Sequence, residues 1–341
     1  MYQLKKQILR SITEVHRIAP EWADLWQRCP VSTTFQRPQW LLPWIEVFSP
    51  EQIVAIEVRN DRKLVGFAPL LIYARGAERV LAFMGGGVSD YLDLLADQQF
   101  ETGVVESLLE IIRREVGWVT LDLTDVPRSS VLLRGSLGES ASEHDSCSVL
   151  TLPRATDELL HLFSKRQRAN LRNARSRLQK IGESQVETAT AETLPEFLED
   201  LLRLHTARWS QAGQPGVLHE EAVKAFHRLS APRLLRSRVL RLYRLRRGSR
   251  TLAVIYALFE RHTVFCYLQG FDPKFAFFSP GTQLMFSVIK DAIQAAIPKF
   301  DFLRGDESYK QHWRAQNQPT YRIQLQRSAL FPESPTRAKA A

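Results

Sequence analysis

Cysteine is scarce in this sequence: 341 residues include only Cys29, Cys147 and Cys266. They are far apart and form no metal-type pair, so we expect three small buried hydrophobes in a reducing compartment and no metal centre. Long apolar runs are also missing, because "LAVIYALF" and "WVTLDL" fall short of the roughly 18 to 20 residues that a membrane-spanning helix needs. The N-terminal segment carries charge but no following apolar core, so no signal peptide is expected. These absences predict a cytoplasmic protein without a transmembrane segment.

Acidic residues are outnumbered by basic ones, 37 against 46, which gives a formal net charge of +9. This balance favours a polyanionic partner, such as nucleic acid, anionic lipid or a phosphorylated cofactor or substrate, without choosing among them.

Length and composition indicate the number of domains and the class of protein. A chain of 341 residues is long for one core and suits two domains, and 44% hydrophobic with 24% charged residues is typical of a globular protein.

One basic segment, residues 164–180, contains no acid from Lys165 to Lys180. Such a run repels itself and favours a partner, although a solvated helix face is the alternative. No aromatic residue interleaves in it, which argues against stacking on single-stranded nucleic acid, and no DNA partner is expected. The predicted polyanion contacts follow a helical spacing of three, four and three residues: Lys165, Arg168, Arg172 and Arg175.

Strand and helix signals are clearest downstream of Arg238. The segments "VLRLYRL", "TLAVIYALFE" and "TVFCYLQGF", separated by tight turns, predict an antiparallel meander. A helix is expected to begin at Pro280 with Ser279 as its N-cap, and residues 299–304 predict a returning strand. Gly281 and Thr282 leave the amides of the first turn uncluttered, as an anion-binding backbone would require; an ordinary capped helix is the alternative.

The N-terminal half repeats this order of elements. Residues 52–74 predict a hairpin turning at Asn60 and Asp61, followed by short strands over 78–86 and 90–97, a helix over 102–116 and a closing strand over 117–126. This copy lacks the Ser-Pro-Gly-Thr turn, so we expect it to be degenerate and only the second copy to bind a cofactor. The sequence therefore predicts a mixed α/β protein with domains at 1–150 and 151–330, packed together, and a flexible tail at 331–341.

Five blocks between Leu159 and Trp313 then resemble a known family: "RANLRNARSRL", "LHTARW", "YLQGFDP", "SPGTQLMFSVIKDAI" and "FDFLRGDESYKQHW". They resemble the CelD/BcsL-like acetyltransferases of cellulose biosynthesis, which belong to the GNAT superfamily and are related to FemAB-type transferases. The N-terminal half matches mainly through "TTFQRPQWLLPW". The resemblance implies two tandem GNAT-like domains and transfer of an acyl group from acetyl-CoA or another acyl-CoA to an amine. The acceptor is left open as a small molecule or a glycan-linked amine.

The resemblance also implies where the cofactor lies. In GNAT enzymes two neighbouring strands splay apart, pantetheine lies against the first strand, and pyrophosphate rests on the following helix. Here the first strand is "FCYLQGF" and the helix begins in "FFSPGT", which has one glycine where the superfamily loop has more. The residues implied to bind the cofactor are Leu268, Gly270, Ser279, Gly281 and Thr282.

Catalytic roles follow from the same resemblance and from residue chemistry. Tyr309 is expected to protonate the departing thiolate; a tyrosine anchoring a helix is the alternative. Asp301 could accept the amine proton, or cap a backbone amide. Lys310 could bind an acceptor carboxylate or phosphate, or form a surface salt bridge with Asp306 or Glu307. Gln269 completes this group as a substrate-binding residue.

His205, Arg208 and Trp209 project from one side of a predicted helix. A histidine beside an arginine keeps a low pKa, which suits a general base, and Arg208 would hold an anionic group of the substrate. Trp209 is expected to line the substrate site. The alternative is a structural histidine beside a core tryptophan.

Two other functions stay open at this point. A FemAB-like transferase that takes an aminoacyl group from tRNA is favoured by the basic helix. A non-catalytic scaffold in exopolysaccharide assembly would need none of the catalytic residues.

Overall fold

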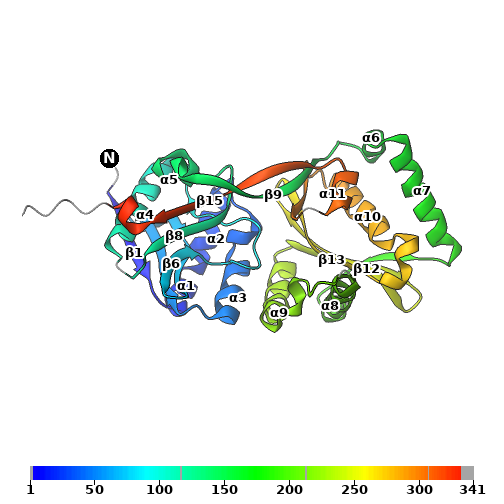
Figure 1. Cartoon of the computed structure of the whole chain (residues 1–341), viewed down its shortest axis with the longest axis horizontal. Helices are drawn as coiled ribbons and strands as arrows, with labels where there is room; N and C mark the ends of the chain where they lie inside the picture. Colours follow the sequence, from blue (N-terminus) through cyan, green and yellow to red (C-terminus); the bar gives the residue numbers. More distant parts are fainter. Residues whose placement is uncertain (1–2, 116, 212, 306, 332–341) are drawn as a thin grey trace, which may run out of the picture. The chain divides into compact units, whose positions relative to one another are not determined.

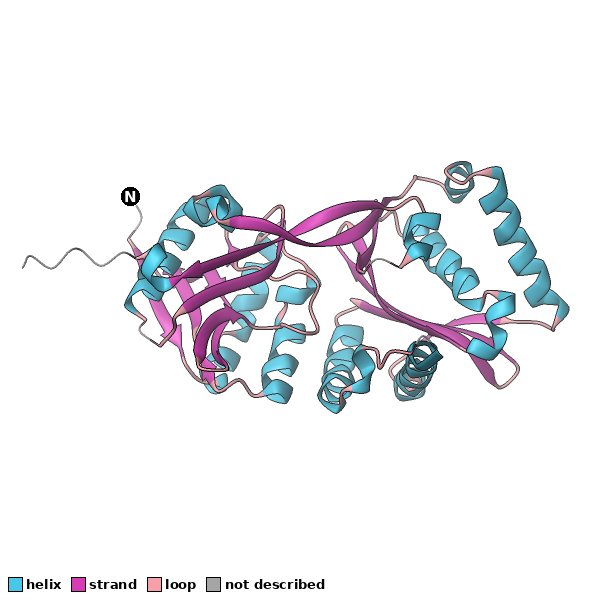
Figure 2. Cartoon of the chain, in the orientation of Figure 1, coloured by secondary structure: helices cyan, strands magenta, loops and turns pink. Residues whose placement is uncertain are grey.

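The computed structural model describes residues 3–115, 117–211, 213–305 and 307–331. The chain divides into two compact units, Met1–Asp145 with Pro319–Ala341, and Ser146–Gln318. Both combine helices with β-sheet, as Figures 1 and 2 show, which confirms the predicted mixed α/β class. Within the described ranges, no helix is long and apolar enough to cross a membrane.

The first unit begins with one strand, continues through helices and then into further strands. Its elements are β1 (Leu4–Leu9), α1 (Ile12–Arg17), α2 (Ala19–Arg28), η1 (Thr34–Gln36), α3 (Pro38–Phe48), β2 (Gln52–Ile53), β3 (Ala55–Asn60), β4 (Lys63–Ala68), β5 (Leu70–Arg75), β6 (Glu78–Phe83), β7 (Leu95–Ala96), η2 (Gln98–Phe100), α4 (Glu101–Arg114), β8 (Thr120–Pro127), η3 (Val131–Arg134), α5 (Ser136–Glu139) and, from the end of the chain, most of β15 (Gln316–Gln326) with α12 (Arg327–Leu330). β1, β3, β4 and β7 form one antiparallel sheet, while β6 pairs in parallel with β8.

The strand predicted over residues 90–97 is wrong except for the two residues of β7. Single backbone bonds reach neighbouring strands there, as from the Leu92 amide to the Asp125 carbonyl at 3.0 Å, and side chains supply further bonds: Gln36 Nε2 donates to the carbonyl of Tyr91 at 2.8 Å. The Asp93 carboxylate accepts from the Leu94 amide at 2.8 Å and from the Ser130 hydroxyl at 2.7 Å. These single bonds satisfy buried polar groups without a continuous ladder, so the segment runs irregularly although it is mostly buried.

The second unit contains the elements that form the candidate site. They are the end of β9 (Ala141–Thr151), α6 (Thr156–His161), α7 (Lys165–Lys180), β10 (Gln185–Thr188), α8 (Leu194–Gln211), η4 (Val217–His219), α9 (Glu221–Arg236), β11 (Leu240–Arg247), β12 (Arg250–Glu260), β13 (Thr263–Phe271), η5 (Pro273–Phe278), α10 (Pro280–Gln294), β14 (Lys299–Arg304) and α11 (Ser308–His312). The strand order is β10-β11-β12-β13-β14-β9, and β13 and β14 are parallel. Figure 1 shows α8 and α9 on one face of this sheet and α10 on the other.

The meander and the helix at Pro280 form as predicted. Apolar residues of α10 pack on the sheet together with the inward residues of β12 and β13, which gives the helix its buried face. Ser279 occupies the N-cap position of α10 as predicted, but its side chain makes no capping hydrogen bond. Ser279 instead closes η5 in the left-handed conformation, with φ of 51°, and its amide donates to the carbonyl of Ala276 at 2.9 Å.

Each unit contains a parallel strand pair joined by a helix, β6-α4-β8 in the first and β13-α10-β14 in the second. The unit boundaries differ from the predicted ones at 150 and 330. Residues from Pro319 onward join the first unit because β15 pairs with β8, from Thr320 opposite Pro127 to Gln326 opposite Thr120. The predicted tail lies outside the described residues except for Phe331, whose ring lies 6.4 Å from that of Trp118.

Candidate active site

The site begins where β13 and β14 separate. Their register contains three pairs, which end at Phe265 opposite Asp301, while β13 continues to Phe271. A bulge interrupts the pairing of β13 with β12 at Tyr267, between Cys266 and Leu268. An extra residue in one strand changes which side chains reach each face beyond it. The bulge thus directs Gln269 and Phe271 toward the opening between the strands.

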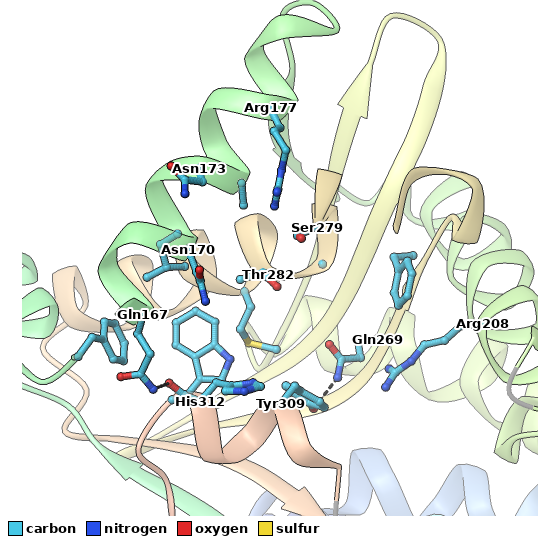
Figure 3. Close-up of a pocket in the computed structure, with 17 residues that line it drawn as sticks. Gln167, Asn170, Asn173, Arg177, Arg208, Gln269, Ser279, Thr282, Tyr309 and His312 are labelled. Atoms are coloured by element: carbon cyan, nitrogen blue, oxygen red, sulfur yellow. Dashed lines mark hydrogen bonds between the residues drawn. The ribbon is translucent and has the colours of Figure 1, made fainter. Parts of the chain in front are cut away.

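A cavity of about 550 Å³ occupies this opening and the space under α7. Figure 3 shows Ser279 and Arg177 at one end of it and Tyr309, Gln269 and Arg208 at the other. Its lining comes from α7, the end of α8, β13, the start of α10 and α11. The lining residues are Phe163, Gln167, Asn170, Leu171, Asn173, Ala174, Arg177, Arg208, Gln269, Phe271, Ser279, Gly281, Thr282, Met285, Tyr309, His312 and Trp313.

Tyr309 reaches the cavity from α11. Its hydroxyl accepts a hydrogen bond of 2.5 Å from Gln269 Nε2, and its ring lies 6.2 Å from that of Phe302 in an edge-on arrangement. Burial is the main cause that raises the pKa of Tyr309 well above its ordinary value, and the nearby Cys266 adds to it. The hydroxyl therefore keeps its proton at neutral pH and is poised to donate it.

Lys310 does not face the cavity, contrary to the substrate-binding role predicted for it. Its ammonium group is buried and donates to the carbonyl oxygens of residues 303–305 at 2.5 to 3.0 Å. It also forms an ion pair with Glu307 at 2.9 Å, one of the predicted alternatives; Asp306 lies outside the described residues. Lys310 thus fixes the backbone between β14 and α11, and with it the position of Tyr309.

Asp301 likewise lies away from the cavity. It is buried at the last pair of β13 and β14, and its Oδ1 accepts a hydrogen bond of 2.8 Å from the Leu303 amide. The predicted alternative of a backbone cap describes it, because this bond stabilises the turn of the chain at Leu303, where φ is 61°.

Gly270 serves helix packing rather than the predicted contact with a cofactor. A Cβ atom at Gly270 would lie 2.5 Å from the backbone nitrogen of His205, so only glycine lets α8 approach β13 this closely. Leu268 is buried two residues earlier on the strand. Both are absent from the cavity lining because that face of β13 is covered by α8.

His205 and Trp209 are also outside the cavity lining. His205 is 3% exposed, and burial, followed by the charge of Arg208, lowers its pKa to about 4, so its low pKa agrees with the prediction. Its ring lies 5.9 Å from that of Trp209, and both pack against the backbone at Gly216. Although His205 is neutral at pH 7, the structure places it as a packed side chain and not as a base at the cavity.

Arg208, in contrast, reaches the cavity from the same helix. Its guanidinium carbon lies 5.7 Å from the ring centroid of Trp209 and 5.9 Å from those of Phe271 and Tyr309. At these distances the aromatic faces attract the cation. Arg208, Gln269 and Tyr309, predicted from three separate sequence blocks, therefore meet at one end of the cavity.

The basic stripe of α7 is turned away from the cavity. Lys165, Arg172 and Arg175 are exposed and Arg168 is half-buried, and none of them is in the cavity lining. Burial of Ala174 and Leu178 fixes the rotation of the helix. The face opposite the basic stripe, which includes Ala174, therefore lines the cavity. That face carries residues missed in the sequence, although their spacing of three, three and four is also helical: Gln167, Asn170, Asn173 and Arg177.

Arg177 is the notable residue among those missed. Its Nε is buried and has no hydrogen-bond partner among the described residues, and its guanidinium lies 4.9 Å from the Phe277 ring centroid. Figure 3 shows its side chain directed toward Ser279 at the start of α10. Ser279, Gly281 and Thr282 line this end of the cavity, where they were predicted to contact an anion. In the part of the chain that is described, no cluster of three His, Cys, Asp or Glu could hold a metal ion.

Comparisons with known proteins find a matching domain model and similar folds. Residues 165–311 match a family model described as an acetyltransferase (GNAT) domain. A search of curated proteins finds no match. Similar solved structures include FemX, with a TM-score of 0.65 and 13% identity over 94% of this chain and 97% of that chain.

Two further structures extend the likeness over most of the chain. L-PGS from Bacillus licheniformis has a TM-score of 0.53 and 10% identity over 89% of this chain and 90% of that chain. A tandem GNAT protein from the clavulanic acid biosynthesis pathway has a TM-score of 0.50 and 11% identity over 95% and 99%. Such identities show the fold alone. The chain therefore has a tandem GNAT-like fold, and residues 165–311 of its second unit match the model of a GNAT acetyltransferase domain.

Proposed function

We propose that the protein is an acyl-CoA-dependent N-acyltransferase that works in the cavity of the second unit. The observation that carries this proposal is the Tyr309 hydroxyl, held by Gln269 beyond the last pair of β13 and β14 and facing the cavity. A protonated hydroxyl at the opening of two strands, with an uncluttered helix start at the other end of the cavity, suits a thioester donor with a phosphorylated tail.

The residues of the cavity fit such a donor. Arg177 and the turn at Ser279, Gly281 and Thr282 would hold phosphate groups, because the buried Nε of Arg177 has no protein partner among the described residues. The carboxamides of Gln167, Asn170 and Asn173 would pair with the amide groups of pantetheine. When bound, acyl-CoA supplies an acyl group activated as a thioester.

Acyl transfer to an amine forms a carbon–nitrogen bond, breaks the carbon–sulfur bond and leaves a thiolate that needs a proton. Tyr309 holds a proton at neutral pH, and its oxygen already accepts from Gln269, so its own hydrogen is directed elsewhere. None of the described residues lining the cavity is Asp or Glu, so the amine is expected to react in its neutral form without a carboxylate base. The proton that the nitrogen loses as the amide forms passes to solvent, and solvent returns a proton to Tyr309, so the products are the amide and the free thiol.

The first test is calorimetric titration of the purified protein with acetyl-CoA, compared between Gly281→Glu and Gly281→Gln. A Cβ at Gly281 would lie 3.7 Å from the Phe271 ring, an ordinary contact, and the two side chains are nearly equal in size, so they differ mainly in charge. We expect the parent to bind, the glutamate variant to lose binding by charge repulsion, and the glutamine variant to retain more of it. No binding by the parent at millimolar ligand would overturn the proposal.

A second candidate function is transfer of an aminoacyl group from tRNA. The observation that favours it is the exposed outer face of α7, where Lys165, Arg172 and Arg175 face away from the cavity and no acid occurs in residues 165–180. Binding of tRNA that weakens with salt and is lost when these three residues are changed to Gln would support it. Equal binding by parent and variant would exclude this surface.

The sequence blocks extend the first proposal to a CelD/BcsL-like enzyme that acts in polysaccharide or cell-envelope synthesis. The remaining alternative is a non-catalytic scaffold in exopolysaccharide assembly. A protein whose function survives Tyr309→Phe with unchanged stability would fit the scaffold and not the enzyme.

A further inference from the structure

The charge of the cavity lining limits which amines it can receive. Among the described residues that line it, the ionisable side chains are Arg177, Arg208, His312 and Tyr309, and none is acidic. An amine in water is mostly an ammonium ion, because an aliphatic amine has a pKa near 10. A cation that enters this cavity finds two guanidinium groups and no carboxylate to pair with, so its desolvation is not offset.

Arg208 is the cation at the reacting end of the cavity. Its guanidinium is half-buried among the rings of Trp209, Phe271 and Tyr309, and no acidic side chain pairs with it among the described residues. Elsewhere in this unit, buried arginines are paired: Arg244 contacts Glu187 at 2.7 Å and Glu196 at 2.6 Å. Arg208 thus keeps its donors for a group that the described residues do not supply.

The two cavity arginines lie at different ends. Arg177 points toward Ser279 at the start of α10, whereas Arg208 lies beside Gln269 and Tyr309 (Figure 3). The proposed donor accounts for Arg177, since its phosphates would lie at the start of α10. It does not account for Arg208 before the reaction, because the bound thioester is uncharged and its thiolate forms only on transfer. We therefore assign the anion that Arg208 binds in the ground state to the acceptor.

We propose that the acceptor is an amine that also carries a carboxylate, and that Arg208 binds this carboxylate next to the Tyr309 hydroxyl. This inference rests on the proposed acyltransferase function. The planar fork of a guanidinium matches the two oxygens of a carboxylate, and the three rings around Arg208 restrict how it is presented.

The same arrangement disfavours polyamines and protein lysine side chains as acceptors, because they bring positive charge without a carboxylate. A carboxylate-bearing amine is neutralised by Arg208. The positive charge of Arg208 also lowers the pKa of the amine beside it, which favours the neutral, nucleophilic form.

The test uses conjugates in which the CoA sulfur is joined through an acetyl linker to the nitrogen of a chosen amine. Three conjugates carry glycine, β-alanine or γ-aminobutyrate, so that the carboxylate lies at different distances. Each has a partner in which a neutral carboxamide replaces the carboxylate, and one further conjugate carries ethylenediamine. We expect at least one carboxylate conjugate to bind the full chain about 10-fold more tightly than its carboxamide partner, as a charge-assisted hydrogen bond allows.

Three variants assign this preference to a residue. Arg208→Gln should bring the carboxylate-to-carboxamide ratio close to one, and Arg208→Lys should leave an intermediate ratio because the charge remains without the fork. Arg177→Gln should weaken all conjugates together and keep the ratio. Arg236→Gln removes an exposed arginine at the end of α9 and is the matched control. Thermal unfolding of each variant shows that it is folded, and Arg208→Lys decides the matter if Arg208→Gln does not fold.

The outcomes separate the two proposals. If the parent does not bind acetyl-CoA, the proposed function fails and this inference fails with it. If acetyl-CoA binds but no carboxylate conjugate is preferred, or the ethylenediamine conjugate binds best, the acceptor assignment alone is overturned. A preference that survives Arg208→Gln would also overturn it.

Discussion

Gln269 donates a 2.5 Å hydrogen bond to the Tyr309 hydroxyl at the opening between β13 and β14. The bond joins a strand residue just beyond the β-bulge to a residue of the short helix α11. Because Tyr309 accepts in this bond, its own hydrogen remains free to be donated. The relationship thus sets the direction in which a proton can leave the tyrosine.

Tyr309→Phe removes this hydroxyl and little else. We expect the rate of thiol release from acetyl-CoA in the presence of an acceptor to fall on the order of 100-fold, as removal of a general acid does. Binding of acetyl-CoA and the unfolding temperature should change little.

The activity that depends on Tyr309 should also have a defined pH dependence. Because burial raises the pKa of Tyr309 well above its ordinary value near 10, the tyrosine should remain protonated as the pH rises through 10. A loss of activity between pH 7 and 9 that disappears in the variant would contradict this.

Gly270→Ala should destabilise the second unit through its backbone contact. The added Cβ would lie 2.5 Å from the His205 nitrogen and 2.7 Å from the Leu204 carbonyl carbon, so α8 must move. We expect the free energy of unfolding to fall by about 1 to 3 kcal/mol, as overpacking usually costs. Gly281→Ala is the control, because its Cβ would lie 3.7 Å from Phe271. Denaturant unfolding of both variants measures the difference, and equal stability would contradict the close packing.

Local patterns predicted most of the fold because they depend on neighbouring residues. The meander, the helix at Pro280 and the tandem arrangement could be read from periodicity, turn residues and a family resemblance. The orientation of α7 could not, because several of its faces have helical spacing and the burial of Ala174 and Leu178 decides among them. Tyr309, Arg208 and Gln269 were found because their blocks resemble a family.

The position of Lys310 could not be predicted for a different reason. It depends on a backbone path with positive φ at Leu303 and Gly305, which brings the carbonyls of residues 303–305 to one point. Leucine rarely adopts this conformation, so the sequence gives no signal for it. The same limit applies to the bulge at Tyr267, which depends on the pairing of β13 with β12.

His205 should make stability depend on pH in a defined direction. Burial lowers its pKa from 6.5 to about 4, so between these values the unfolded chain binds more protons than the folded chain. Stability is therefore complete above about pH 6.5 and is lost as the pH falls toward 4, by about 3 kcal/mol from this group. Denaturant unfolding at pH 7 and pH 4.5 measures the loss. It should be smaller in His205→Gln, and an equal loss in parent and variant would contradict this account.

Lys310→Met should affect stability and activity together. The change removes a buried ammonium that donates to three carbonyls and pairs with Glu307, and it leaves these groups without their cation. Breaking such a buried interaction costs roughly 3 to 5 kcal/mol, whereas Lys299→Met, at the exposed start of β14, should change stability by about 0.5 kcal/mol or less. Since Lys310 anchors the segment that carries Tyr309, thiol release from acetyl-CoA should also fall at temperatures where the variant is folded. If Lys310→Met is as stable as Lys299→Met but inactive, the lysine acts on the substrate and not on the fold, because a structural role cannot be lost without a loss of stability.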